Sequence, residues 1–321
     1  MERFAIAADL GGTNLRVAVV SETGTILERI ALKTERQHGR EAVVRELSEA
    51  VLSLSLKLAG AKQLAGIGIG VPGIIYIETG MLRASPNLPG WENYPVRSEI
   101  ESLVGSSVYL ENDANAAALG EKWLGLGRGV DSLCMLTLGT GVGGGIVLDG
   151  KILHGFLGFA GELGHIVVSE NGVACPCGGQ GCLEMESSAT AVVRKAQEVL
   201  AANRTPALAG AIQNGAALTS KLVYDVAKGG DAVCIGIFQS VGKYLGIAVG
   251  GLVNALNLPL YVIGGGGAGA WDLFAPSMIE EARRRSYVFR EGSTRIEKSL
   301  LGDDAGLCGA ARLAFEGSGK K

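Results

Sequence analysis

The chain opens with two short apolar runs separated by a glycine turn. Residues 4–8 are mostly apolar, residues 10–13 contain the turn, and apolar residues return over 17–20. Runs of this length, bounded by turn residues, predict two β-strands joined as a hairpin. The same arrangement returns at 133–153, where a tight Asp-Gly turn ends the second strand. The repetition predicts two copies of one architectural unit.

Apolar residues at helical spacing predict a helix over 41–59, with Gly60 as its end. Short apolar runs at 64–70 and 106–110 predict buried strands. The second of these strands leads into Glu-Asn-Asp-Ala-Asn and a helical stretch to about residue 124.

A further apolar run at 260–263 predicts a strand that leads through glycines 264–267 into a helix to about residue 285. Residues 303–315 predict a last helix, which we expect to pack back on the first domain. The predicted organisation is an N-terminal α/β domain of residues 1–113 plus 303–321, and a larger C-terminal α/β domain of residues 114–302 that carries the cysteine cluster.

Composition adds one anomaly, because 50 of the 321 residues are glycine. There is no three-residue period and only 8 prolines, which excludes collagen. The glycines are interleaved with branched apolar residues, which excludes a flexible linker. Hydrophobic residues make up 47% and charged residues 19%, as in a globular protein. The backbone must therefore often turn sharply or approach another group closely.

Charge and targeting signals exclude several classes. The net charge of −3 argues against a nucleic-acid binder. The longest apolar run, 245–253, is broken by glycines and is shorter than the roughly 18 residues of a membrane helix. The N-terminus has no signal-peptide pattern. Three of the six cysteines crowd into residues 175–182, which favours a metal site in a cytoplasmic protein over a disulfide framework.

The glycine motifs favour phosphate binding over dinucleotide binding. The pattern G-x-G-x-x-G occurs three times, but none of the three has the strand, helix and later acid that a dinucleotide site needs. Glycine turns let successive N–H groups approach a phosphate, although each turn alone could be a plain hairpin turn. Asp9 ends the first strand, where a carboxylate can hold Mg²⁺. Arg16 could contact phosphates or form a structural ion pair. The candidate phosphate and Mg²⁺ residues of the two turns are Asp9, Gly11, Gly12, Thr13, Gly139, Thr140 and Gly141.

These turns, with the other motifs, resemble the ROK family (repressors, open reading frames, kinases) of the actin-like sugar kinase superfamily, and its glucokinase branch most closely. The resemblance runs almost end to end and rests on residues 9–16, 138–141, 162–165, 175–182, 222–226, 244–246, 262–266 and 302–306. It implies two actin-like (ribonuclease H-like) α/β domains with a cleft between them. It also implies ATP-dependent phosphorylation of glucose at the 6-hydroxyl.

A candidate metal site follows from cysteine spacing. Cys175, Cys177 and Cys182 lie in a glycine-rich loop, and His165 precedes them. Three thiolates and one imidazole make a closed tetrahedral site, the form of structural Zn²⁺. Free buried cysteines and a catalytic zinc are the alternatives, and the first suits the isolated Cys134, Cys234 and Cys308. The family resemblance implies the same four ligands.

Glu162 and Glu184 bracket this metal site in the sequence. A loop folded around the ion would bring both carboxylates toward one place, where they could accept hydrogen bonds from sugar hydroxyls. Each alone is more typical of a solvated acid. We expect His165 to contact the sugar as well.

Asn112 and Asp113 follow a predicted strand and precede a helix. Either could be an ordinary helix N-cap, and the helix dipole would also favour an ionised base there. The resemblance implies that Asp113 is the general base and that Asn112 binds sugar. By the same resemblance, Gly73 and Asn87 contact the sugar, and the glycines at 264–267 lie near the adenosine.

Other functions remain open at this point. The motifs are shared by kinases for N-acetylmannosamine, N-acetylglucosamine, fructose or another hexose, and the phosphoryl donor could differ from ATP. A sugar-sensing ROK regulator would carry a preceding helix-turn-helix, for which this sequence leaves no room. A non-catalytic sugar-binding module is disfavoured by Asp9 and Asp113. We expect small-molecule partners only, no membrane, and a homodimer or homotetramer by resemblance.

Overall fold

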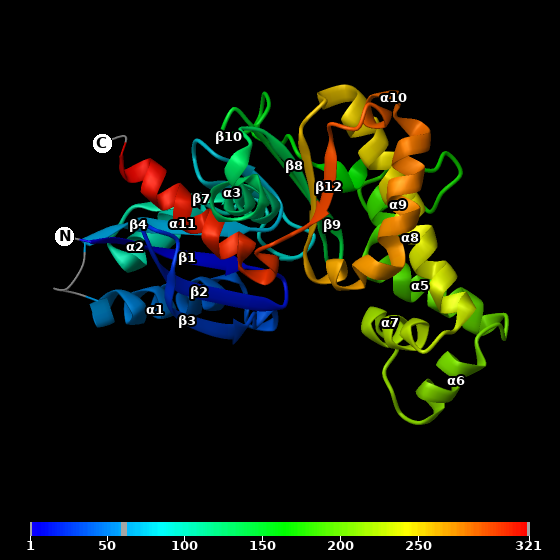
Figure 1. Ribbon diagram of the computed structural model, residues 1–321. Helices are drawn as coiled ribbons and strands as arrows, with labels where there is room; N and C mark the ends of the chain where they lie inside the picture. The colour runs from blue at the N-terminus through cyan, green and yellow to red at the C-terminus, as the bar shows by residue number, and fades with distance from the viewer. Residues whose placement is uncertain (1, 59–62, 320–321) are drawn as a thin grey trace. The chain divides into compact units, whose positions relative to one another are not determined.

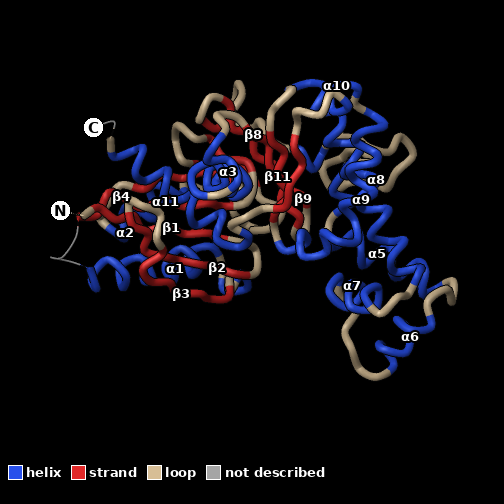
Figure 2. Tube along the Cα trace, viewed as in Figure 1, coloured by secondary structure: helices blue, strands red, loops and turns tan. Residues whose placement is uncertain are grey.

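The computed structural model describes residues 2–58 and 63–319 (Figure 1). The predicted helix end at Gly60 lies outside the described residues. Within them, the strands form two five-stranded sheets and one two-stranded sheet (Figure 2). The first sheet has the order β3-β2-β1-β4-β7, made of β1 (Arg3–Leu10), β2 (Asn14–Ser21), β3 (Ile26–Lys33), β4 (Gln63–Val71) and β7 (Val108–Asn112). Strand β2 is antiparallel to β1 and β3, whereas β4 is parallel to β1 and β7.

The second sheet repeats this arrangement. Its order is β10-β9-β8-β11-β12, made of β8 (Leu133–Leu138), β9 (Val142–Leu148), β10 (Lys151–Ile152), β11 (Leu260–Gly264) and β12 (Arg295–Lys298). In each sheet, the first three strands in the sequence form an antiparallel meander. The two later strands extend the sheet on the open side of the first strand. The predicted duplication of the glycine-turn hairpin is therefore confirmed. A small antiparallel pair, β5 (Ile74–Tyr76) and β6 (Met81–Ala84), completes the strands of the described residues.

The first sheet is covered on both faces because its strands alternate. Phe4 and Ile6 of β1 belong to a core with helices α1 (Arg40–Leu58) and α2 (Val96–Val104). Ala5 and Ala7 point to the opposite face and pack against α11 (Ala305–Ser318). The small side chains on that second face let α11 lie close to the strands. The tail helix therefore packs on the first sheet, as predicted.

Glycine makes the contacts of α11 possible. A Cβ on Gly68 of β4 would lie 1.7 Å from the Ala310 carbonyl oxygen, and one on Gly309 would lie 1.6 Å from that of Ala116. Ala116 belongs to α3 (Asp113–Leu124), which lies beside α11 (Figure 1). Backbone thus meets backbone on both sides of α11, which accounts for part of the glycine excess.

The chain divides into two compact units at other points than the sequence predicts. The first unit comprises Met1–Met135, Gly145–Gly161 and Leu300–Lys321, and the second comprises Leu136–Gly144 and Glu162–Ser299. The sequence pattern predicts residues 114–135 and 145–161 in the C-terminal domain. They join the first unit because α3 packs on α11 and because Gly145 lies against α3, where its Cβ would be 2.7 Å from the Ala114 carbonyl oxygen.

The second unit contains most of the remaining helices. They are α4 (Leu183–Ser187), α5 (Ala189–Ala201), α6 (Pro206–Gln213), α7 (Ser220–Lys228), α8 (Ala232–Leu256), α9 (Trp271–Arg285) and α10 (Tyr287–Arg290). Short 3₁₀ turns occur in both units, at Arg36–His38, Leu126–Gly129, Leu163–His165, Gly266–Ala270 and Gly302–Asp304. Ser188, Thr205 and Thr219 each cap the helix that follows with a side-chain oxygen.

Helix α8 lies along α9 and approaches it through a row of glycines (Figure 1). A Cβ on Gly242 would lie 2.1 Å from the Phe274 carbonyl oxygen, and one on Gly246 would lie 2.5 Å from that of Met278. Among the described residues, α8 is the one helix that is long and apolar enough to cross a membrane. Buried core helices also meet this criterion of length and composition. Its close backbone contacts with α9 are those of a core helix.

Two substitutions within α8 should distinguish a glycine that packs against α9 from a glycine whose Cβ position faces open space. Gly242→Ala is expected to lower the free energy of unfolding by about 1–3 kcal/mol, because the added methyl group meets α9 backbone. Gly251→Ala is the matched control: outside the backbone of its own helix, no described residue has an atom within 4 Å of its Cβ position, so removal of a helical glycine should stabilise by about 0.5–1 kcal/mol. Thermal unfolding of both variants measures the difference, and equal melting temperatures would contradict this account of the helix pair.

Candidate functional site

The first glycine turn is fixed by Thr34. The Thr34 hydroxyl donates to the Gly11 carbonyl oxygen at 2.8 Å, and the Thr34 amide donates to the carbonyl oxygen of Thr13 at 2.9 Å. Gly12 lies against Asn87, because a Cβ there would be 2.9 Å from the Asn87 carbonyl oxygen. The structure therefore brings one predicted sugar residue next to the predicted phosphate turn within the first unit.

Asp9 lies at the end of β1 in a charged network. An Oδ2 of Asp9 is 3.7 Å from Nη1 of Arg16, and Nη2 of Arg16 is 3.3 Å from Oδ2 of Asp303. Burial raises the pKa of Asp9, the nearby Asp303 raises it further, and Arg16 opposes both effects. Of the two roles that the sequence left open for Arg16, the structure shows the ion pair. A cation bound beside Asp9 would offset the effect of burial.

The N-terminus of α3 joins three of the predicted site residues. The Asn112 side chain accepts hydrogen bonds from the amides of Ala114 (2.9 Å) and Asn115 (3.1 Å), and it donates to the Gly73 carbonyl oxygen (3.1 Å). Asn112 is therefore the helix cap, and Asp113 is the first helical residue. An Oδ1 of Asp113 accepts from the Ala114 amide at 2.8 Å. The two N-cap possibilities that the sequence left open are settled in favour of Asn112.

A buried glutamate that the sequence analysis missed supports this helix start. Glu111 is 2% exposed, and its Oε1 accepts from the Asn112 amide (2.9 Å) and the Asn115 side chain (3.1 Å). Its Oε2 lies 2.7 Å from Nε2 of His154. This hydrogen bond to Glu111 raises the pKa of His154. An acid at the end of a buried strand is the only sequence signal for Glu111, and nothing local indicates its histidine partner.

The second glycine turn, residues 139–142, is held by the segment that contains α4 and the start of α5. Three hydrogen bonds form this contact: the Ala189 amide to the Gly139 carbonyl oxygen (2.9 Å), the Thr190 hydroxyl to the Thr140 carbonyl oxygen (2.8 Å), and the Val142 amide to Oε2 of Glu184 (2.9 Å). The sequence predicts a sugar contact for Glu184 and contains no sign of its bond to this turn.

The third glycine cluster lies against the end of β8. Gly265 has a φ of +76°, and a Cβ there would lie 2.5 Å from the Leu138 carbonyl oxygen. Outside its own helical turn and its chain neighbours, no described residue has an atom within 4 Å of the Cβ position of Gly266. The second unit thus places the cluster expected near the nucleoside next to turn 139–142.

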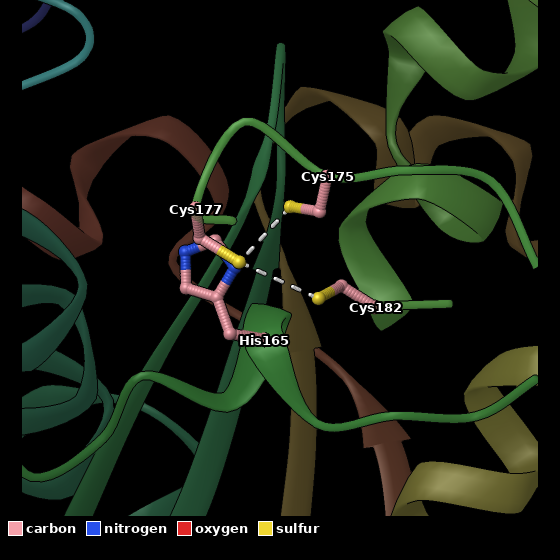
Figure 3. Close-up of side chains that lie close together, drawn as sticks. All are labelled: His165, Cys175, Cys177 and Cys182. Atoms are coloured by element: carbon pink, nitrogen blue, oxygen red, sulfur yellow. Dashed lines mark hydrogen bonds between the residues drawn. The ribbon is translucent and has the colours of Figure 1, made fainter. Parts of the chain in front are cut away.

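The predicted metal ligands come together in the second unit (Figure 3). The ligand atoms of His165, Cys175, Cys177 and Cys182 all lie within 4.8 Å of one another. The Sγ atoms of Cys177 and Cys182 are 3.7 Å apart, and Nδ1 of His165 is 3.7 Å from Sγ of Cys175. Tetrahedral zinc with Zn–S bonds of ~2.3 Å requires sulfur atoms ~3.8 Å apart, so the donor set fits this ion.

The chain wraps around this cluster by local pairing. Val167 and Cys182 form an antiparallel bridge, and the Leu183 amide donates to the Ile166 carbonyl oxygen at 2.9 Å. Gly179 lies beside two of the sulfurs, because its Cβ position is in ordinary van der Waals contact with Sγ of Cys177 (3.5 Å) and Sγ of Cys182 (3.6 Å). By contrast, burial raises the pKa of Cys134 to about 12 and the pKa values of Cys234 and Cys308 to about 11. These three remain isolated thiols, as the sequence predicts.

Glu162 lies on the other side of the imidazole. Its Oε2 is 3.9 Å from Nε2 of His165, while Nδ1 of the same ring faces the sulfurs. Burial raises the pKa of Glu162, Glu184 raises it further, and His165 opposes these effects. The negative charge of Glu184 therefore acts on the carboxyl group of Glu162 within the second unit.

Comparison with known proteins places these features in a family. The residue pattern of the ROK family matches residues 5–316. A glucokinase from Thermotoga maritima is 40% identical over 317 residues, which cover 97% of each chain. A xylose repressor from Caldicellulosiruptor bescii is 33% identical over 97% of this chain and 77% of its own length.

A solved structure shares the fold. A ROK family glucokinase from Streptomyces griseus, in complex with glucose and AMPPNP, superposes with a TM-score of 0.85 at 32% identity, covering 98% of this chain and 99% of that one. This likeness, with the repeated sheet order, confirms the predicted actin-like α/β fold class. Because the family pattern spans nearly all of the chain and relatives keep this level of identity over its length, the protein belongs to the ROK family.

Proposed function

We propose that this chain is a glucokinase, which transfers the γ-phosphoryl group of ATP to the 6-hydroxyl of glucose. The observation that carries the proposal is the start of α3, where Asn112 caps the helix and binds Gly73 while Asp113 occupies the first helical position. A carboxylate there, favoured in its charged form by the helix dipole, can accept a hydroxyl proton. The glucokinase from Thermotoga maritima, at 40% identity, supports the same activity.

Asp113 is the proposed general base, which takes the proton of the 6-hydroxyl as that oxygen attacks the γ-phosphorus. The other proposed sugar ligands are polar side chains and one backbone group. They are Gly73, Asn87, Asn112, Glu162, His165 and Glu184. With Nδ1 of His165 facing the sulfurs, its Nε2 is the nitrogen that can meet a sugar hydroxyl.

The nucleotide phosphates are assigned to the two glycine turns, through Gly11, Gly12, Thr13, Gly139, Thr140 and Gly141, and the nucleoside to Gly265 and Gly266. Asp9 would hold Mg²⁺, and the ion would neutralise part of the negative charge of the phosphates. Turn N–H groups stabilise charge that develops on the transferring phosphoryl.

His165, Cys175, Cys177 and Cys182 would hold a structural Zn²⁺, whose four protein ligands leave no position for chemistry. The metal's part is to fix the loop that carries Glu162 and Glu184. Thiolate ligands fit a reducing cytoplasm.

We also propose that the chain assembles as a homodimer or a homotetramer. Light scattering of the purified protein tests this oligomeric state.

The test is the formation of sugar phosphate across a panel of hexoses and N-acetylhexosamines, with ATP, GTP or polyphosphate as donor. Glucose with ATP is expected to give the highest kcat/KM. A preference for N-acetylmannosamine, N-acetylglucosamine or fructose would reassign the substrate within the same mechanism. Sugar binding without turnover on any donor would point instead to a sensor related to the xylose repressor and would refute the kinase proposal.

A further inference from the structure

One continuous segment links the metal cluster to the second glycine turn. Cys182, a metal-ligand candidate, precedes α4, and Glu184 follows two residues later. Ala189 and Thr190 open α5 directly after α4. All three hydrogen bonds on turn 139–142 described above come from this segment, which we name the brace (residues 182–190).

The turn is also in contact with the other end of the metal loop. Gly164 directly precedes His165, and a Cβ on Gly164 would lie 2.0 Å from the Val142 carbonyl oxygen. A Cβ on Gly141 would lie 2.1 Å from Oε2 of Glu184. Residues beside two of the four metal ligands therefore contact the turn, and glycines at both places permit that approach.

The brace fixes the direction of two peptide groups. In a trans peptide the C=O and the following N–H point in opposite directions. Because the Ala189 amide holds the Gly139 carbonyl, the Thr140 N–H points away from the brace. Because the Thr190 hydroxyl holds the Thr140 carbonyl, the Gly141 N–H also points away from it. Two successive N–H groups facing the same side form the kind of nest that binds a phosphate oxygen.

We propose that the metal site sets the affinity for the phosphoryl donor, because the brace orients the N–H groups of turn 139–142. This inference rests on the proposed function, in which the turn binds the nucleotide phosphates. Gly139 and Gly141 have no side chains with which to restrain the turn, so its preorganisation depends strongly on the segments that hold it. Thr190 is a positioning residue in this scheme, and it is separate from the residues assigned to sugar.

The first test changes Thr190 and measures binding of AMPPNP with Mg²⁺ by calorimetry. Thr190→Val keeps the shape of the side chain and removes the donor, and it is expected to weaken AMPPNP about two- to tenfold. Thr190→Ser keeps the hydroxyl and should bind within about twofold of the original chain. Glucose affinity and zinc content should be the same in both variants, because neither the sugar ligands nor the metal ligands change.

The second test uses reciprocity between the two sites. If the metal favours nucleotide binding, the nucleotide must favour metal retention by the same factor. At equilibrium with a chromogenic chelator, a smaller fraction of the zinc should therefore be transferred when AMPPNP is present, and Thr190→Val should reduce that effect. Zinc-depleted protein that stays folded should bind AMPPNP more weakly than the loaded protein.

The outcomes separate the two proposals. Unchanged AMPPNP affinity in Thr190→Val, together with zinc transfer that does not respond to AMPPNP, would overturn the coupling and leave the kinase proposal intact. If the zinc-loaded original chain does not bind AMPPNP at all, the assignment of turn 139–142 to nucleotide is wrong and the proposed function fails first. If depletion of zinc unfolds the protein, the Thr190 pair still decides the matter, because both variants keep the metal.

Discussion

Replacing Asp113 with asparagine is expected to lower kcat for glucose phosphorylation by about 10²- to 10⁴-fold, the range typical of a lost general base. The amide cannot take the proton from the 6-hydroxyl. The fold should survive because Asn112, not Asp113, caps α3 and bonds to Gly73. Asparagine can still accept the hydrogen bond from the Ala114 amide. Steady-state kinetics and glucose binding by calorimetry together give the split between turnover and affinity.

Asp231→Asn is the matched control for this variant. Asp231 also begins a helix, since its side chain caps α8 by accepting from the Cys234 amide at 2.9 Å. Asparagine caps helices as well as aspartate does, so this variant should keep kcat and lose at most the contribution of the Thr205 hydroxyl bond to Oδ2 (3.0 Å). Asp113→Asn with kcat within about threefold of the original chain would remove the base assignment. A large loss of glucose affinity with kcat intact would instead make Asp113 a sugar ligand only.

The sequence predicted those parts of the fold that depend on local patterns. The apolar run at 64–70 became β4 because its residues are buried together, and periodicity correctly indicated α3 and α11. The division into units was not predictable in this way. It depends on α11 lying between β4 and α3, and a glycine such as Gly309 does not reveal in sequence which backbone it will meet.

The candidate site shows the same limit. The four metal-ligand candidates lie within eighteen positions of one another, so their spacing alone indicated a cluster. The Glu111–His154 pair and the Thr190–Thr140 bond join segments far apart in the chain through common residue types that form no motif. Such contacts depend on how the strands and helices pack, which a single sequence does not specify. Arg16 shows an intermediate case, because an ion pair was one of its two predicted roles but neither of its partners, Asp9 and Asp303, was predicted.

Cys177→Ser is expected to abolish stoichiometric zinc binding and to lower the melting temperature. The thiolate is the ligand, and a serine hydroxyl does not ionise near neutral pH to replace it. Cys177 is the exposed member of the cluster, so in a metal-free chain the substitution itself should cost no more than about 0.5 kcal/mol. Almost all of the measured loss should therefore come from the lost metal. Zinc bound about 100-fold above its Kd contributes about 3 kcal/mol, which corresponds to roughly 6–12 °C in a domain of this size.

Chelation distinguishes a lost metal from a damaged fold. Treatment of the original chain with a strong chelator should lower its melting temperature by the same amount as Cys177→Ser, and the chelator should have no further effect on the variant. Cys308→Ala, at a buried thiol outside the cluster, should lose stability through its cavity but keep one zinc per chain. Full zinc content in Cys177→Ser would exclude this residue from the ligand set. If chelation lowered the melting temperature of Cys177→Ser further, the remaining three ligands would still hold the metal. The site would then not require the closed shell of four protein ligands that is typical of structural zinc.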